Sequence, residues 1–223
     1  QILSYHRIAT PRFVVYTRGS AVKPPKRLKY PLFVKSTIED ASFGLSKDSI
    51  VHTPDELVAR VKFCYDEIGT DVLVEEYIEG RECYVGIIGN QRLQVLPIWE
   101  LLFTKLPEGE PNIATAPVKW EAKVQKKLGV KTTQAKNLPD GMESQIQNLC
   151  KRIYRALSLS GYARMDLRIT ADGRAFVLEA NPNPNLSYGE DFAESAHVAG
   201  IKYPALLQRL LTLGLSYRPA WRG

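Results

Sequence analysis

The stretch RMDLRITADGRAFVLEAN, residues 164–181, decides how we interpret this chain. It reads as two short strands joined by a tight turn, because Asp172-Gly173 supplies residues that accept the positive φ angles of a two-residue hairpin loop. If the loop consists of those two residues, Asp166 lies opposite Glu179 on the neighbouring strand. The sequence therefore predicts two carboxylates held side by side.

Two opposed carboxylates need a compensating charge. Like charges directly across a strand pair destabilise the sheet, so a proton or a cation is required at the pair. In the same register Arg164 lies opposite Asn181, on the same face as the acids, because side chains alternate along a strand. Asp166, Glu179 and Asn181 offer the oxygen ligands that Mg²⁺ prefers, and Arg164 suits an anion. The alternative is a charge network in which Arg164 and Arg168 neutralise the acids.

The composition is that of a globular protein with one large domain or two small ones. The chain has 223 residues, of which 44% are hydrophobic, and a net charge of +6. It contains no apolar run near the roughly 18 residues of a membrane-spanning helix, and no signal peptide is visible at its start. The positive charge fits a phosphate-bearing small molecule as well as nucleic acid, but the basic runs 18–29 and 119–136 lack interleaved aromatics suited to stacking on bases. We expect neither a membrane nor a nucleic-acid partner.

The cysteines and the first residue bear on where the protein works. Cys64, Cys83 and Cys150 are odd in number and widely spaced, which indicates buried thiols rather than disulfides or a metal site. We therefore expect a cytoplasmic protein. Because the chain does not begin with Met, we expect it to be cut from a longer protein.

Local signals predict the remaining elements. Thr53-Pro54-Asp55-Glu56 marks the start of a helix that Gly69 ends. Residues 102–140 hold several prolines and glycines with little periodicity, which indicates a functional lid or a disordered segment. The order of the elements predicts two subdomains that meet near residue 78. The chain further reads as strands over 30–35, 71–78, 82–88 and 91–98, and as helices over 142–159, 190–199 and 204–214.

Several charged residues outside the hairpin fit either a binding role or an ordinary surface position. Lys35 ends an apolar strand and precedes a loop of small residues, which suits a phosphate, but an ordinary surface lysine fits equally. Glu75, Glu76 and Glu82 flank the next turn, where carboxylates either accept hydrogen bonds from a ribose or an exocyclic amine, or form a solvated acidic turn. Lys123 lies in the predicted lid among many other lysines.

Taken together, these pieces resemble the ATP-grasp superfamily, and most closely its D-alanine–D-alanine ligase branch. The resemblance covers nearly the whole chain and implies an α+β, ATP-grasp fold of two α+β subdomains with the nucleotide cleft between them. The small subdomain would span 1–78, the large one 79–216, and a tail 217–223. The matching stretches are YPLFVK (30–35), the loop at 36–44, VLVEEYIEGRE (72–82), WEAK (120–123) and GYARMDLRITADGRAFVLEANPNPN (161–185).

The resemblance also implies an ATP site. Lys35 would contact the α- and β-phosphates, Glu75 the adenine and Glu82 the ribose, while Lys123 would approach the γ-phosphate and the loop around 41–44 would cover the phosphates. The nucleotide-contacting residues that it implies are Lys35, Ser42, Phe43, Gly44, Glu75, Glu76, Tyr77, Ile78, Glu82 and Lys123.

The implied reaction is carboxylate–amine ligation through an acyl-phosphate. Asp166, Glu179 and Asn181 would bind Mg²⁺, with Mn²⁺ as a substitute, and Arg164 and Lys123 would be the catalytic residues. Arg164 would stabilise the acyl-phosphate and the developing oxyanion. The implied partners are a small-molecule carboxylate, a small-molecule amine and, in some relatives, a second copy forming a homodimer.

This chain departs from the family pattern in two ways, and these departures favour an alternative function. The family has an N-terminal substrate domain, and we expect this chain to start after it, so the isolated chain would need that domain or a partner chain. Glu190 falls near the position of a hydroxyl residue that holds the carboxylate of the incoming amino acid, and it would repel such a carboxylate. We expect a cationic or amide-bearing acceptor. The alternative function is an ATP-binding module without ligase activity.

Overall fold

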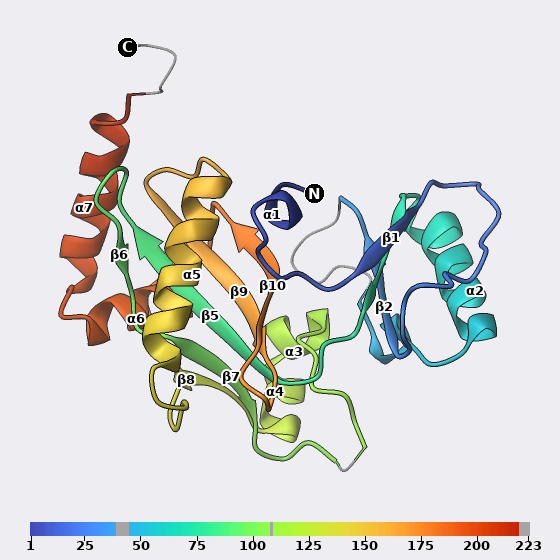
Figure 1. The fold of residues 1–223 in the computed structure, drawn as a ribbon. Coiled ribbons are helices and arrows are strands. Elements are labelled where there is room, and N and C mark those ends of the chain that lie inside the picture. Colours follow the sequence, from blue (N-terminus) through green and yellow to red (C-terminus); the bar gives the residue numbers. More distant parts are fainter. Residues whose placement is uncertain (39–44, 108, 219–223) are drawn as a thin grey trace. The chain divides into compact units, whose positions relative to one another are not determined.

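The computed structural model describes residues 1–38, 45–107 and 109–218, and it has the predicted α+β character, with helices packed on antiparallel sheets (Figure 1). The chain divides into two compact units that are interleaved along the sequence. The large unit consists of residues 1–10, 79–102 and 132–223, and the small unit of residues 11–78 and 103–131. The bounds expected from the sequence place residues 1–10 in the small subdomain and residues 103–131 in the large one. The subdomain bounds stay a prediction.

The small unit is built on a four-stranded antiparallel sheet. Its strand order is β1 (Phe13–Tyr16), β4 (Val72–Glu76), β2 (Leu32–Ser36) and β3 (Ile50–Val51). A short 3₁₀ turn, η1 (Lys47–Ser49), leads into β3. The central strands β2 and β4 bury alternate residues such as Val34 and Val74, because side chains alternate between the two faces of a strand.

A helix packs on one face of this sheet. α2 (Pro54–Phe63) begins where the sequence predicts, with the Thr53 side chain accepting a hydrogen bond from the Glu56 backbone amide. It continues as a π-helical turn, η2 (Cys64–Ile68), and ends at Gly69, whose φ of 80° is left-handed. Such a conformation favours glycine. Leu57, Val61 and Cys64 of this helix pack against the sheet core.

The segment that the sequence reads as structureless contains regular elements. α3 (Ala116–Trp120) and α4 (Ala122–Leu128) lie in the small unit, and β8 (Val130–Gln134) follows them. The expectation of a stretch without regular structure over 102–140 was therefore wrong for this part of the segment, and its role as a lid stays a prediction. Both helices are shorter than the window over which a 3.6-residue period becomes readable.

The large unit is built on a six-stranded antiparallel sheet. Its path runs β10 (Ala175–Asn181), β9 (Tyr162–Ile169), β5 (Arg81–Ile88), β7 (Trp99–Phe103) and β8, and β6 (Gln94–Val95) pairs with β5. β5 and β9 pair along their whole length, from Arg81 opposite Ile169 to Ile88 opposite Tyr162. β5 and β9 are therefore the inner strands on which the polar side chains of the site are placed.

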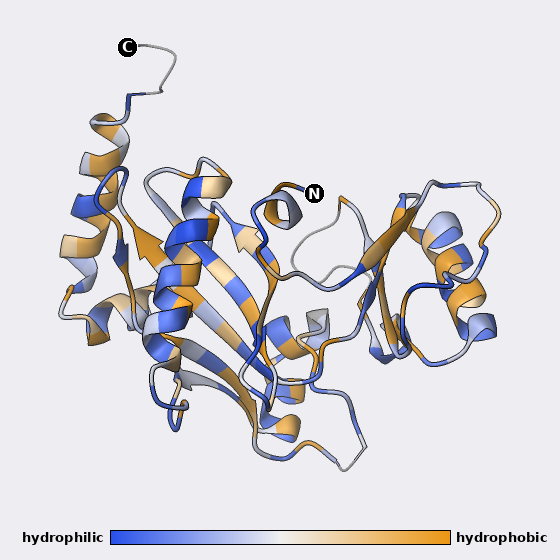
Figure 2. Ribbon diagram, viewed as in Figure 1, coloured by the Kyte–Doolittle hydropathy of each residue, from blue (hydrophilic) through white to orange (hydrophobic). Residues whose placement is uncertain are grey.

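One face of the large sheet is covered by α5 (Met142–Ala156), which carries the predicted apolar stripe. Ile146, Cys150 and Ile153 pack against Val85 and Met165 of the sheet. Figure 2 shows hydrophobic colouring along β5 and hydrophilic colouring over much of the visible side of α5. The short helix α1 (Ile2–Tyr5) lies near α5.

Two further helices pack on the large unit. α6 (Asp191–Val198) and α7 (Tyr203–Leu215) share a second apolar cluster with β5, centred on Phe192, Leu206 and Ile88. A side chain at Gly86 would meet Leu96 and Phe192 at 2.7 and 3.0 Å, so this glycine lets α6 approach the sheet. Within the described ranges, no helix combines the length and the hydropathy that crossing a lipid bilayer requires.

The hairpin of 164–181 corrects the predicted turn while keeping the predicted pairing. The Thr170 amide donates to the Arg174 carbonyl, so the loop consists of Ala171, Asp172 and Gly173 rather than two residues. Near the loop the register is offset from the predicted one, and an irregularity between Val177 and Glu179 shifts it back. A β-bulge adds one residue to one strand, which cancels the extra loop residue.

Candidate functional site

A continuous polar face lies on the large sheet, on the side away from α5. Glu82 and Tyr84 of β5 are directly opposite Arg168 and Asp166 of β9. Their odd-numbered neighbours, such as Cys83, belong to the core beneath α5. Because side chains alternate, polar residues of β9 and β10 also lie on this face. Its members are Glu82, Tyr84, Arg164, Asp166, Arg168, Glu179 and Asn181.

The two acids predicted from the hairpin meet as expected. Glu179 is the cross-strand partner of Asp166, and Asn181 is that of Arg164. Asp166 is buried, at 6% exposure, and both of its oxygens accept hydrogen bonds from Arg164, at 2.7 and 2.8 Å. Glu179 forms no ion pair with any of the described residues. Arg164 therefore neutralises Asp166, while the exposed Glu179 carboxylate lies across the strand pair from Asp166 and adds a negative charge there.

The environment of Asp166 opposes its ionisation. Burial raises the pKa of Asp166 to about 6, Arg164 works against that rise, and Glu179 and Glu82 add to it. A cation at the pair would oppose both the burial and the repulsion. The residues present fit a divalent ion, because two carboxylates and the Asn181 amide are hard oxygen donors. Within the described part of the chain, no group of three or more His, Cys, Asp or Glu side chains is arranged to hold a metal.

The Glu82 carboxylate accepts hydrogen bonds from two different side chains, which the sequence did not predict. Its Oε1 accepts a hydrogen bond of 2.8 Å from the Tyr84 hydroxyl, and its Oε2 accepts one of 2.6 Å from Arg168. The Arg168 guanidinium also donates to the Gly80 carbonyl at 3.1 Å. The Arg164 guanidinium lies 4.8 Å from the centre of the Tyr84 ring, within the range of a cation–π contact. Burial, followed by the charge of Glu82, raises the pKa of Tyr84 well above its ordinary value.

In the small unit, Lys35 and Glu75 contact one another. The Lys35 ammonium lies 2.7 Å from the Glu75 carboxylate, with their side chains 25% and 10% exposed. Both lie on the face of β2 and β4 opposite to α2, since Val34 and Val74 point to the helix. Lys35 is therefore paired with a carboxylate, and its contact with a phosphate stays a prediction.

The other small-unit residues predicted from the resemblance are dispersed. Glu76 accepts hydrogen bonds from the Lys29 amide at 2.8 Å and from Arg12 at 3.3 Å. The Tyr77 hydroxyl donates to the Asn112 carbonyl at 3.4 Å.

Two more of these predicted residues, Ile78 and Lys123, are placed by the structure without a test of their roles. Ile78 is partly buried after β4, and Lys123 is exposed on α4. Ser42, Phe43 and Gly44 lie outside the residues that the structure describes.

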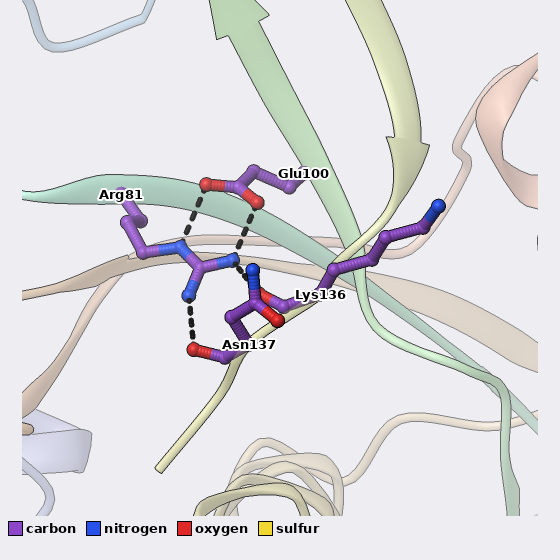
Figure 3. A network of polar contacts seen from close by, with 4 residues as sticks. All are labelled: Arg81, Glu100, Lys136 and Asn137. Carbon is purple, nitrogen blue, oxygen red and sulfur yellow. Dashed lines mark hydrogen bonds and ion pairs between the residues drawn. The ribbon is translucent and has the colours of Figure 1, made fainter.

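A second two-bond ion pair anchors the start of β5. Arg81 donates to both oxygens of Glu100 on β7, at 2.7 and 2.6 Å (Figure 3). It also donates to the backbone carbonyls of Lys136 and Asn137. Glu100 is only 6% exposed. This pair ties β5, β7 and the segment after β8 together. The sequence carried no signal for it, because Arg81 and Glu100 lie on different strands whose register no local pattern sets.

The chain matches a known family over most of its length. The family model described as "D-ala D-ala ligase C-terminus" covers residues 2–212. An uncharacterized protein of Sinorhizobium fredii, y4sG, is 36% identical over 208 residues, which cover 92% of this chain and 57% of that protein. A D-alanine–D-alanine ligase of Desulfotalea psychrophila is 31% identical over 196 residues, or 88% of this chain and 57% of the ligase. The chain thus spans little more than half the length of these relatives.

Solved structures of similar proteins have the same fold. The D-alanine–D-alanine ligase of Bacillus anthracis complexed with ATP matches with a TM-score of 0.75 and 25% identity, over 96% of this chain and 63% of that one. A second structure of the B. anthracis ligase matches with a TM-score of 0.77 and 26% identity, over 96% and 64% of the two chains.

Proposed function

The chain belongs to the D-alanine–D-alanine ligase C-terminal family, and on that premise we propose that it is the ATP-binding part of an ATP- and Mg²⁺-dependent ligase that joins a carboxylate to an amine. Its fold is the ATP-grasp fold. Because the chain spans 57% of its first relatives, the proposal includes an N-terminal domain or a partner chain for catalysis. It also includes small-molecule substrates, a cytoplasmic location and a homodimer.

The observation that carries the proposal is the pairing of Asp166 with Glu179. Both acids lie at adjoining strands with one guanidinium bonded to one of them. Opposed carboxylates destabilise a sheet unless a cation neutralises them. Mg²⁺ is held in proteins by one or two carboxylates together with substrate phosphates. A nucleotide–metal site is therefore the function that best accounts for this arrangement.

In the large unit we assign the metal to Asp166, Glu179 and Asn181. The ion would neutralise charge on the phosphates of ATP. Arg164 is already desolvated, with a side chain 16% exposed, and its planar guanidinium suits oxyanions. Arg164 would therefore stabilise the charge that develops on the acyl-phosphate and on the tetrahedral intermediate. Glu82 would accept hydrogen bonds from the ribose hydroxyls.

In the small unit we assign Lys35 to the α- and β-phosphates. Its ammonium lies 2.7 Å from the Glu75 carboxylate, and this ion pair keeps it on the sheet face. A phosphate bound there would compete with Glu75 for the ammonium. Glu75 would accept a hydrogen bond from the adenine amine, and Lys123 would approach the γ-phosphate. The remaining nucleotide contacts that we propose come from Ser42, Phe43, Gly44, Glu76, Tyr77 and Ile78.

The proposed reaction has two steps. An oxygen of the substrate carboxylate attacks the γ-phosphorus of ATP, the bond to the bridging oxygen breaks, and ADP leaves. The amine then attacks the carbonyl carbon of the acyl-phosphate, loses a proton and expels phosphate, which forms the amide. Phosphoryl transfer depends on positioning and charge neutralisation more than on a protein nucleophile, so the buried cysteines have no part in it.

The acceptor preference rests on the start of α6. Glu190 is the N-cap residue of α6, and it is exposed. Asp191, the next residue, raises the pKa of Arg164, although less than Asp166 does and against the opposing effect of burial. We propose that these two carboxylates disfavour an acceptor with a free carboxylate and favour a cationic or amide-bearing amine.

The second candidate function is an ATP-binding module that ligates nothing alone. It is favoured by the 57% coverage of the relatives and by the acidic start of α6. The two candidates share ATP and metal binding and differ in turnover. Release of phosphate in the presence of an acid and an amine would decide for the ligase.

The first experiment is calorimetric titration of the chain with ATP, with and without Mg²⁺. We expect Mg²⁺-dependent binding that Glu179→Gln abolishes. Glu143→Gln makes the same change of charge on an exposed residue of α5, and it should bind ATP as the wild type does. Binding that is equal with and without Mg²⁺, or that survives Glu179→Gln, would contradict the metal assignment.

A further inference from the structure

Tyr84 lies at the centre of the polar face of the large sheet and contacts both of its charged halves. Its hydroxyl donates to Glu82 at 2.8 Å, and the Arg164 guanidinium lies 4.8 Å from the centre of its ring. On the opposite strand β9, its partner is Asp166. Tyr84 is 6% exposed, so its phenol lies almost entirely inside the protein.

Glu82 differs from the other acids of this sheet in how it meets its arginine. Asp166 gives both oxygens to Arg164, and Glu100 gives both to Arg81. Glu82 gives one oxygen to Arg168 and the other to the Tyr84 hydroxyl. A guanidinium and a carboxylate favour the two-bond arrangement when nothing else competes. The Tyr84 hydroxyl thus occupies one oxygen of Glu82, while Arg168 meets the other oxygen through Nη2 and directs Nη1 to the Gly80 carbonyl.

We propose that Tyr84 is a positioning residue that orients Glu82 for the ribose hydroxyls of the bound nucleotide. This inference rests on the proposed function. Each carboxylate oxygen can accept more than one hydrogen bond, so Glu82 keeps acceptor capacity while both internal donors hold it still. The Arg164 guanidinium packs on the Tyr84 ring and keeps the phenol in place.

The test is the discrimination between ATP and 2′-deoxy-ATP, measured by calorimetric titration with Mg²⁺. We expect the wild type to bind ATP about tenfold more tightly than 2′-deoxy-ATP, which lacks one hydroxyl. In Tyr84→Phe the ring remains and the hydroxyl is lost, so we expect the ratio to fall about fivefold. A purely structural role would lower both affinities together and leave the ratio unchanged.

The matched control is Tyr154→Phe. Tyr154 is also buried, at 1% exposure, and its hydroxyl donates to the Gly89 carbonyl at 2.8 Å. It belongs to α5 and the core on the other face of the sheet. We expect Tyr154→Phe to keep the ratio of the wild type, so that loss of a buried tyrosine hydroxyl alone is separated from loss of the contact with Glu82.

A second variant series tests whether Tyr84 acts through Glu82. Because Tyr84 acts through Glu82, Glu82→Gln should lose the discrimination, and Tyr84→Phe added to it should lose no more. Three results would overturn this inference and leave the proposed function standing. They are an unchanged ratio in Tyr84→Phe, equal binding of both nucleotides by the wild type, and additive losses in the double variant. A wild type that binds neither nucleotide would overturn the proposed function and, with it, this inference.

Discussion

Asp166 and Glu179 are directly opposed on β9 and β10, although the loop that joins the two strands is one residue longer than a two-residue turn. The bulge between Val177 and Glu179 restores the register. Without it, the extra residue would place Glu179 on the other face of the sheet, since side chains alternate. The metal site that we propose thus depends on two local irregularities that cancel.

Removing the charge of Glu179 is expected to stabilise the metal-free protein. In Glu179→Gln the repulsion with Asp166 across the strands is lost, and the free energy of unfolding should rise by roughly 0.2–1 kcal/mol. Urea unfolding in the presence of a chelator measures it. Glu143→Gln serves as the control for a change of net charge, and a Glu179→Gln protein less stable than the wild type would show that the two acids do not repel one another.

Breaking the ion pair between Arg168 and Glu82 is expected to destabilise the fold strongly. Both residues are buried, at 3% and 7% exposure, so Arg168→Met would leave a buried carboxylate without its cation and lower the free energy of unfolding by about 3–5 kcal/mol. Adding Glu82→Met should recover part of the loss. Denaturant unfolding of the two single variants and the double variant gives the coupling energy.

The matched control for that cycle is the exposed pair of Arg174 and Asp172. Their side chains are 68% and 58% exposed, and such surface pairs contribute no more than about 1 kcal/mol. Arg174→Met should therefore leave stability nearly unchanged. Equal losses in Arg168→Met and Arg174→Met would show that burial does not set the strength of these pairs.

The three thiols are expected to be unreactive in the folded protein. Burial raises the pKa of Cys83 to about 12, and burial also raises the pKa of Cys64 and Cys150. The thiolate is the reactive form, and raised pKa values lower its fraction. Ellman's reagent should label no cysteine of the native protein at pH 8 and all of them in denaturant. Fast labelling of the native protein would show that the core opens locally.

Two glycine substitutions are expected to have opposite effects. Gly173 in the hairpin loop has a φ of 80°, and a side chain there would meet Met142 at 3.0 Å. Gly173→Ala should therefore lower the free energy of unfolding by about 1 kcal/mol. Gly214, near the end of α7, has open space around it and an ordinary φ. Gly214→Ala should raise stability by about 0.5–1 kcal/mol. Thermal unfolding compares them, and a neutral Gly173→Ala would show that the loop adapts.

Short-range patterns predicted the parts of the fold that depend on neighbours in the chain. The cap at Thr53, the stop at Gly69 and the stripe of α5 are confirmed. The cross-strand pairing of Asp166 with Glu179 is also confirmed, because the two strands are joined by one tight loop. The two-residue loop was wrong, since Asp-Gly also fits a longer loop in which the glycine alone adopts a positive φ.

The sequence by itself determined which residue types lie on each face of the hairpin, because alternation along a strand is a property of the backbone. Only the tertiary structure decided that Glu82 and Tyr84 of β5 lie beside Arg168 and Asp166 of β9. That pairing joins strands separated by α5 and by β7, and no local signal sets the register between strands so distant in sequence. The burial that follows from it is what converts ordinary acids and arginines into a desolvated network with shared hydrogen bonds.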